Sequence, residues 1–229
     1  QTLKKTKIKL LLISFPHNPT TLTVDQVFYD NLVELAEKYN FLIVNDFAYS
    51  DIYFDGNKPP SLLSSDKSLS HSVELYSLTK GFSMAGWRVG FAVGNKDAIS
   101  SLTKLKSYID YGTFQPIQIA STVALNELGE YPFELSSVYK ERREIIVETL
   151  KDLDFNVQES KATMFVWAKL PEKFRNDSLT FSLELLDKSN VAISPGVGFG
   201  KYGEGHIRIA LVENKQRIRQ AMKNIKAVL

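Results

Sequence analysis

The sequence predicts an α/β protein with a mostly parallel sheet and helices, followed by a small α+β region. Residues 7–15 form an apolar strand pattern, residues 23–39 show helical spacing of apolar side chains, and residues 41–44 are an unbroken apolar run. Strand, helix and strand at this spacing make a βαβ unit, whose two strands must be parallel. After residue 153 the character changes, and short strands alternate with helices.

The remaining elements follow from local patterns. Thr23 is the expected N-cap of the first helix, whose buried stripe should contain Val27, Leu32, Leu35 and Ala36. A charged helix over 132–153 is long enough to join two domains, which we place at residues 1–135 and 136–229. We expect further strands near 72–77, 88–93, 154–158, 163–169, 191–194 and 206–212, and further helices over 96–109, 115–128, 178–188 and 214–228.

Composition and charge exclude several classes of protein. The chain of 229 residues is 44% hydrophobic and 24% charged, and no apolar run approaches the roughly 20 residues that span a bilayer. The net charge of +2 is spread along the chain, which predicts neither a nucleic-acid nor a membrane partner. The absence of cysteine excludes disulfides and thiolate metal sites and fits a cytoplasmic location, and three isolated histidines predict no metal site.

Lys80 lies in a segment whose composition suits a phosphate and an aldehyde. An isolated loop lysine is usually a solvated charge. Lys80, however, follows a predicted strand at its carboxyl end, where ligands bind in open α/β sheets. Ser77 lies three residues before it and Arg88 eight residues after it. A serine hydroxyl and an arginine fork are donors for phosphate, and a lysine amine reacts with aldehydes.

This segment resembles the lysine signature of class I aminotransferases of fold type I, in the aspartate aminotransferase superfamily. The stretch from Ser77 to Gly90 matches S-x-[ST]-K-x-x-x-x-x-G-x-R-x-G at every fixed position. The resemblance implies a pyridoxal 5′-phosphate enzyme with Lys80 as the Schiff-base lysine. It also implies that Ser77 and Arg88 bind the cofactor phosphate and that Thr79 supplies the hydroxyl beside the lysine.

Asn18 follows the first predicted strand, in the sequence Asn18-Pro19-Thr20. Taken alone, Asn-Pro indicates a turn. In the resembled family an N-P-[TS]-G element occupies this position, and its asparagine binds the 3′-oxygen of the cofactor. The family glycine is replaced here by Thr21, which puts the geometry of this turn in question.

Asp46 and Tyr49 follow the second strand. A carboxylate after an apolar strand needs a cationic or donating partner, and without the lysine signature Asp46 would be interpreted as a helix N-cap. The resembled family has D-x-A-Y here, which casts Asp46 as the partner of the protonated pyridine nitrogen. A charged hydrogen bond of this kind is worth about 1.5–3 kcal/mol. The same resemblance places Tyr49 on the 3′-oxygen.

Arg208 lies in the strand pattern His206-Ile207-Arg208-Ile209-Ala210. Alternation puts His206, Arg208 and Ala210 on one face, and a planar guanidinium there calls for a bidentate anion or a salt bridge. The resemblance implies that Arg208 binds the α-carboxylate of the substrate. No motif assigns a role to His206 or His17, and we interpret both as structural.

Two loops give weaker indications. The resemblance puts Tyr111 and Thr113 in a loop that can reach substrate, and no arginine stands between Arg88 and Arg142 to bind a distal carboxylate. Residues 194–200 resemble the family's P-G-x-x-F-G loop, whose glycines shape the substrate side or simply form turns.

The resemblance runs from end to end but covers about the last three-fifths of a usual family member. The family's other phosphate contacts come from a glycine-bearing turn upstream, and this chain has no glycine before Gly56. We therefore expect a carboxyl-terminal fragment. Residues 1–135 would be the last part of the cofactor-binding large domain, with an incomplete sheet, and residues 136–229 the small domain. Whether such a fragment keeps cofactor and activity is left open by the sequence.

The function implied is transfer of an amino group between an L-amino acid and a 2-oxo acid, in a homodimer of the intact enzyme. Phe15–Thr20, Asp110–Phe114 and Ile207–Leu211 resemble bacterial alanine-synthesising (glutamate–pyruvate) aminotransferases most. Aspartate aminotransferases, LL-diaminopimelate aminotransferases and fold type I β-lyases remain alternatives. So does a ligand-sensing domain of a transcription regulator, which the near-neutral charge does not favour.

Overall fold

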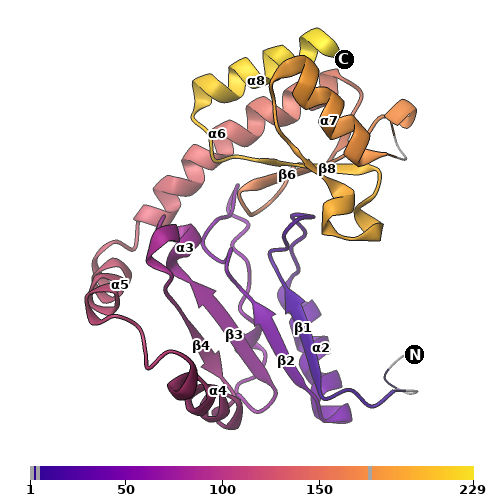
Figure 1. Ribbon diagram of the computed structural model, residues 1–229. Helices are drawn as coiled ribbons and strands as arrows, with labels where there is room; N and C mark the ends of the chain where they lie inside the picture. The colour runs from indigo at the N-terminus through magenta and orange to yellow at the C-terminus, as the bar shows by residue number, and fades with distance from the viewer. Residues whose placement is uncertain (1–2, 4–5, 175–176) are drawn as a thin grey trace. The chain divides into compact units, whose positions relative to one another are not determined.

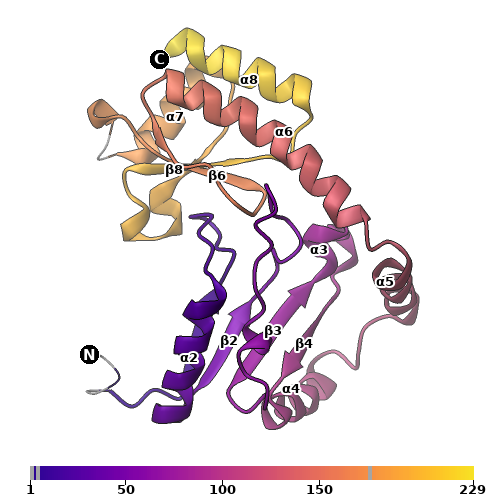
Figure 2. The same ribbon diagram turned by 180° about the vertical axis from the view of Figure 1, so that it is seen from behind.

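The computed structural model describes residues 3, 6–174 and 177–229 (Figures 1 and 2). The chain forms two compact units. The first contains the chain up to Pro16 together with Thr23–Glu134, and the second contains His17–Leu22 and Leu135–Leu229. Each unit has its own sheet.

The sheet of the first unit is mostly parallel, as predicted. Its strands are β1 (Leu10–Ser14), β2 (Leu42–Asp46), β3 (Ser72–Ser77) and β4 (Gly90–Gly94), in that spatial order. β1, β2 and β3 are parallel neighbours, and β4 runs antiparallel to β3. The carboxyl ends of three strands therefore meet at one edge of the sheet, and β4 begins at the same edge, as Figure 1 shows.

The helices of this unit lie close to the predicted ranges. They are α2 (Gln26–Tyr39), α3 (Leu78–Gly81), α4 (Lys96–Ile109) and α5 (Gln115–Glu127), with single 3-10 turns at Leu62–Ser64 and Ala85–Trp87. α2 and α4 contact strands of the sheet, α5 packs through Ala124 against Leu78 and Met84, and the short helices form connections between strands.

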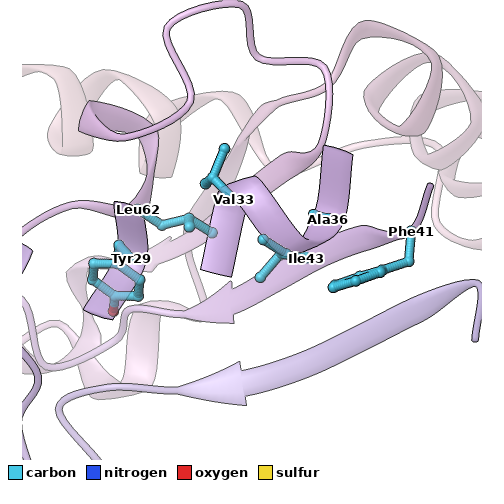
Figure 3. Close-up of a cluster of buried hydrophobic side chains, with 6 residues drawn as sticks. All are labelled: Tyr29, Val33, Ala36, Phe41, Ile43 and Leu62. Carbon is cyan, nitrogen blue, oxygen red and sulfur yellow. The ribbon is translucent and has the colours of Figure 1, made fainter. Parts of the chain in front are cut away.

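The main core of the first unit lies between α2 and the sheet. Figure 3 shows six of its side chains, which come from α2, from β2 and the residue just before it, and from the 3-10 turn after β2. All six are at most 5% exposed. Burial of apolar surface on this scale is the principal force that holds a helix against a sheet. The cluster contains Tyr29, Val33, Ala36, Phe41, Ile43 and Leu62.

Two details of α2 differ from the prediction. The N-cap is Asp25 rather than Thr23, and the Asp25 side chain accepts a hydrogen bond from the backbone N–H of Phe28. The buried face follows Tyr29, Val33 and Ala36, whereas the predicted stripe residues Val27 and Leu35 are 61% and 39% exposed. The aromatic ring of Tyr29 sets the rotation of the helix, because its large apolar surface gains most from facing the sheet.

The second unit is a small α+β structure. Its sheet has the order β5-β6-β8-β7 with antiparallel neighbours, and the predicted strands are present but shorter. α6 (Tyr131–Asp152) carries the unit boundary in its first turn. The other elements are β5 (Asn156–Val157), β6 (Phe165–Lys169), β7 (Ser194–Pro195), β8 (His206–Ala210), α7 (Ser178–Ser189) and α8 (Lys215–Val228), with 3-10 turns at Glu172–Phe174, Gly196–Phe199 and Lys201–Gly203.

Within the described residues, every helix is too short or too polar to cross a bilayer. The same part of the chain has no group of three or more histidine, aspartate or glutamate side chains that could hold a metal ion.

Val33→Ala should lower the free energy of unfolding by about 2 kcal/mol, because two methyl groups leave a buried site and a small cavity remains. Val27→Ala is the matched control on the same helix, since Val27 is 61% exposed, and it should change stability by less than about 0.5 kcal/mol. Urea denaturation of both variants measures the difference. Equal losses would contradict the packing face that Figure 3 shows.

Candidate active site

Lys80 lies in the single helical turn α3 that follows β3 directly. Ser77 caps this turn, because its Oγ accepts a hydrogen bond of 3.2 Å from the backbone N–H of Thr79. Leu78, 1% exposed, anchors the turn by packing with Met84 and with Ala124 of α5. Lys80 is thus carried on a short rigid segment at the carboxyl end of the sheet. Ligands of open α/β proteins bind at this end.

Asp46 is the last residue of β2, at the same edge of the sheet. Its side chain is exposed, and Oδ1 accepts a hydrogen bond of 3.2 Å from the backbone N–H of Ala48. The residues after it form turns, so Asp46 caps no helix. Tyr49 follows within these turns, is 7% exposed, and its ring centroid lies 5.7 Å from Nζ of Lys80. The first unit thereby gathers Asp46, Tyr49 and Lys80 at one edge.

Arg88 lies between α3 and β4 and is exposed. Its backbone has a left-handed φ of 52°, and its Nη1 donates to the carbonyl of Ala85 at 3.0 Å. Two residues later, Gly90 pairs with Ser77 across β3 and β4. A Cβ at Gly90 would lie 2.4 Å from the carbonyl oxygen of Tyr76, so this position admits only glycine without movement of the strands. Close pairing at Gly90 keeps the Arg88 segment beside Ser77.

A hydrogen-bonded pair, Tyr76 and Asp51, lies beside α3, the turn that carries Lys80. The Tyr76 hydroxyl donates to Asp51 Oδ2 at 2.5 Å, and the pKa of Tyr76 is raised by burial and then by this carboxylate. The same carboxylate would be 2.7 Å from a Cβ at Gly81, the residue after Lys80. Sequence reasoning missed this pair, because nothing in the spacing of Asp51 and Tyr76 indicates a contact.

Arg208 occupies β8 of the second unit, and the alternation predicted for this strand is confirmed. Its guanidinium carbon lies 4.2 Å from the ring centroid of Phe165 and 4.4 Å from that of Phe199. Nη1 donates to Asn18 Oδ1 at 2.7 Å, and Nη2 lies 3.4 Å from Ser194 Oγ. Two aromatic rings and two polar partners fix the plane of the fork, as anion recognition requires.

The sequence did not predict Phe165 as a partner of Arg208. Phe199 lies in the loop over residues 194–200, which resembles the family's P-G-x-x-F-G element. That resemblance was the only feature of the sequence that drew attention to Phe199. Phe165 lies on β6, two residues before Trp167, which pairs with Arg208 across the strands. Strand alternation could have placed Phe165 on the face of Arg208 if the pairing of the strands had been known.

The loop of Asn18 belongs to the second unit and is tightly turned. The peptide bonds before Pro16 and Pro19 are cis, and the backbone N–H of Thr21 donates to the carbonyl of His17 at 2.8 Å. Thr21 has a left-handed φ of 60°, a conformation that favours glycine and is strained for a β-branched residue. Threonine therefore adopts here a backbone conformation that glycine reaches more easily.

His206 and His17 both contact neighbouring side chains of the second unit. The His206 ring stacks on Trp167 with centroids 5.1 Å apart. His17 Nδ1 is 2.6 Å from Thr20 Oγ1, and burial lowers the pKa of His17. The interpretation of both histidines as structural stays a prediction.

Tyr111 and Thr113 lie in the segment between α4 and α5 of the first unit. Tyr111 is 97% exposed, and the carbonyl of Thr113 accepts from Gln118 Nε2 at 2.5 Å. The first unit therefore does not pack the Tyr111 ring against the residues at the sheet edge.

The fold and the lysine-bearing edge of the sheet define a class of protein, the α/β aminotransferases. Residues 1–225 match the family described as aminotransferase class I and II. The chain belongs to this family.

Relatives agree with this assignment. The chain is 44% identical to the glutamate–pyruvate aminotransferase AlaC of Escherichia coli K12, over 97% of this chain and 54% of that protein. It is also 44% identical to an LL-diaminopimelate aminotransferase of Natranaerobius thermophilus, over 96% of this chain and 56% of that protein. The structure of substrate-bound BacF from Bacillus subtilis matches with a TM-score of 0.91 and 34% identity, over 99% of this chain and 57% of that one. The chain spans about half the length of the curated relatives it matches.

Gly90→Ala should destabilise the first unit by about 1–3 kcal/mol, because the added Cβ meets the backbone of β3 and the strands must separate. Gly86→Ala is the control within the same motif, since a Cβ there meets nothing within 4 Å, and it should leave stability nearly unchanged. The midpoint of urea denaturation measures both. A larger loss for Gly86→Ala would contradict the close approach at Gly90.

Proposed function

We propose that the intact protein is a pyridoxal 5′-phosphate-dependent aminotransferase that moves an amino group between an L-amino acid and a 2-oxo acid. The observation that carries the proposal is the placement of Lys80, just after β3, at the same sheet edge as Asp46, the last residue of β2. Membership of the family supports it.

The donor set of the first unit fits the cofactor in its chemistry. An amine at Lys80 suits the aldehyde, and a carboxylate at Asp46 suits a protonated pyridine nitrogen. Hydroxyls at Ser77 and Thr79 and the guanidinium of Arg88 suit the phosphate. The family resemblance also assigns Tyr49, and Asn18 of the second unit, to the 3′-oxygen.

In this proposal each residue has a defined task. The cofactor, when bound, supplies an electron sink for the electrons that remain when the substrate loses its Cα proton. Lys80 would hold the cofactor through its amine and, once the amine of the substrate has displaced it, the freed amine would accept the Cα proton of the substrate. Asp46 keeps the ring nitrogen protonated by a charged hydrogen bond. Arg208 binds the α-carboxylate with its clamped guanidinium and so orients the Cα–H bond.

The preferred substrates that we infer are alanine and glutamate with their 2-oxo acids. The relative AlaC, named for glutamate and pyruvate, supports this choice, and an LL-diaminopimelate aminotransferase at the same identity is the second candidate. The absence of arginine between Arg88 and Arg142 argues against aspartate. Tyr111 and Thr113 would contact substrate in the intact protein. Initial rates with a panel of amino donors and 2-oxo acids separate these possibilities, and release of pyruvate from cystathionine would indicate a β-lyase instead.

The location and assembly of the intact protein are also inferred. A chain of 229 residues without cysteine suits the reducing cytoplasm. A homodimer is proposed from the family resemblance, and sedimentation of the full-length protein measures it.

Lys80→Ala should abolish turnover and remove the visible absorption of bound cofactor, because the amine that holds the aldehyde is lost. Borohydride reduction followed by peptide mass spectrometry should add the cofactor mass to the Lys80 peptide of the unmodified protein and to no peptide of the variant. Lys104→Ala, at an exposed lysine of α4, is the control and should behave as the unmodified protein. An unchanged spectrum in Lys80→Ala would refute the proposed function.

Arg208→Lys should raise the KM for the amino donor by about 10- to 100-fold, the equivalent of one charged hydrogen bond, because lysine lacks the planar fork. The dissociation constant of the cofactor should change by less than about threefold, since residues other than Arg208 are proposed to bind the cofactor. Arg217→Lys is the matched control, because Arg217 is an exposed residue of α8. Equal losses of cofactor and donor binding in Arg208→Lys would instead indicate a structural arginine.

A further inference from the structure

Asn45 is a fully buried amide directly before Asp46 in β2, with 0% of its surface exposed. Its Nδ2 donates to the Tyr29 hydroxyl and to Glu74 Oε1, both at 3.1 Å. Its Oδ1 accepts from the backbone N–H of Phe15 at 3.3 Å. Every polar group of the side chain is therefore used, which a buried amide requires if it is not to cost stability.

Glu74 forms the other half of this network and is 6% exposed. Its Oε1 also accepts from the backbone N–H of Leu62 at 2.7 Å, and Oε2 accepts from Ser61 Oγ at 2.6 Å. These three donors are neutral, so hydrogen bonds from neutral groups hold a buried carboxylate beside Asn45. Burial, and then the charge of Glu74, raises the pKa of Tyr29, which keeps its hydroxyl neutral.

The network joins the segments that carry the candidate cofactor residues of the first unit. Phe15 is the residue after β1, Asn45 precedes the last residue of β2, and Glu74 lies on β3, which leads into the turn of Lys80. The last ladder pair between β1 and β2 is Ser14 with Asp46. The bond from Phe15, one residue past Ser14, to Asn45 therefore adds a side-chain link between the ends of the two strands beside Asp46.

The two neighbouring side chains point in opposite directions. Alternation along β2 directs Asn45 towards the buried face, together with Ile43, and directs Asp46 to the other face. A rotation of the strand end that relaxed Asn45 would turn Asp46 by the same amount. Charged hydrogen bonds weaken steeply when the angle is lost, and a binding group must be held within roughly 0.5 Å of its working position.

We propose that Asn45, with Glu74 and Tyr29, is a positioning residue that fixes the carboxylate of Asp46 for its partner at the sheet edge. This inference rests on the proposed function, because that partner is the ring nitrogen of the cofactor. Asn45 itself touches neither cofactor nor substrate.

The test is a titration of the cofactor-free full-length protein with pyridoxal 5′-phosphate, together with its melting temperature. Asn45→Leu keeps the volume but removes the amide, and it should raise the dissociation constant at least about tenfold, the loss expected when one charged hydrogen bond is misdirected. Ile43→Val, on the same strand and face, should lower the melting temperature but leave the dissociation constant within about twofold. Glu74→Gln keeps an acceptor for Asn45 and should raise the constant by less than about threefold.

Asn45→Ser provides the same test if Asn45→Leu does not fold, because a serine hydroxyl is too short to reach both Glu74 and Phe15. Wild-type affinity for the cofactor in a folded Asn45 variant would overturn this inference but would leave the proposed function intact. So would an equal loss of affinity in Ile43→Val, since that result would attribute the effect to stability. Failure of the unmodified protein to bind the cofactor would refute the proposed function itself.

Discussion

Parallel pairing of β1, β2 and β3 is the constraint on which the rest of the first unit depends. Parallel strands bring their carboxyl ends to one edge, so residues far apart in sequence, such as Asp46 and Lys80, lie at the same edge without any local signal that joins them. The antiparallel β4 begins at that edge with Gly90 paired to Ser77, so Arg88, two residues before Gly90, also lies near the edge. A slip of one residue in β2 would exchange the faces of Asn45 and Asp46 and would destroy both the network and the exposed carboxylate.

The sequence predicted this architecture well because the relevant patterns are local. Apolar runs and helix spacing located nearly every element, and the lysine motif located the segment of Lys80. The buried face of α2 was predicted only in part: Ala36 and Leu32 pack in the core, but Val27 and Leu35 are exposed, because only contact with the sheet decides which apolar side chains are buried. The rings around Arg208 were missed for the same reason, because cross-strand neighbours depend on pairing that the sequence does not state.

The first unit buries the polar side chains of Asn45 and Glu74, although apolar side chains would not need hydrogen-bond partners there. Asn45 and Glu74 lie at the level of the sheet where the strands end, whereas Ile43, two residues earlier in β2, belongs to the apolar cluster. Apolar packing tolerates small shifts, but hydrogen bonds of fixed length and angle do not. Along β2 the contacts therefore change from apolar packing at Ile43 to hydrogen bonds at Asn45. This change occurs where the exact position of the next side chain, Asp46, matters for the proposed function.

The aromatic clamp around Arg208 has a consequence for molecular recognition. An unrestrained arginine loses about 2 kcal/mol of side-chain entropy when it is immobilised by a ligand. Phe165 and Phe199 impose that loss during folding, so the carboxylate proposed to bind Arg208 would meet a guanidinium that is already oriented. A group shared by every amino acid and 2-oxo acid would then be bound in the same way, and selectivity among them has to arise from contacts to the rest of the molecule.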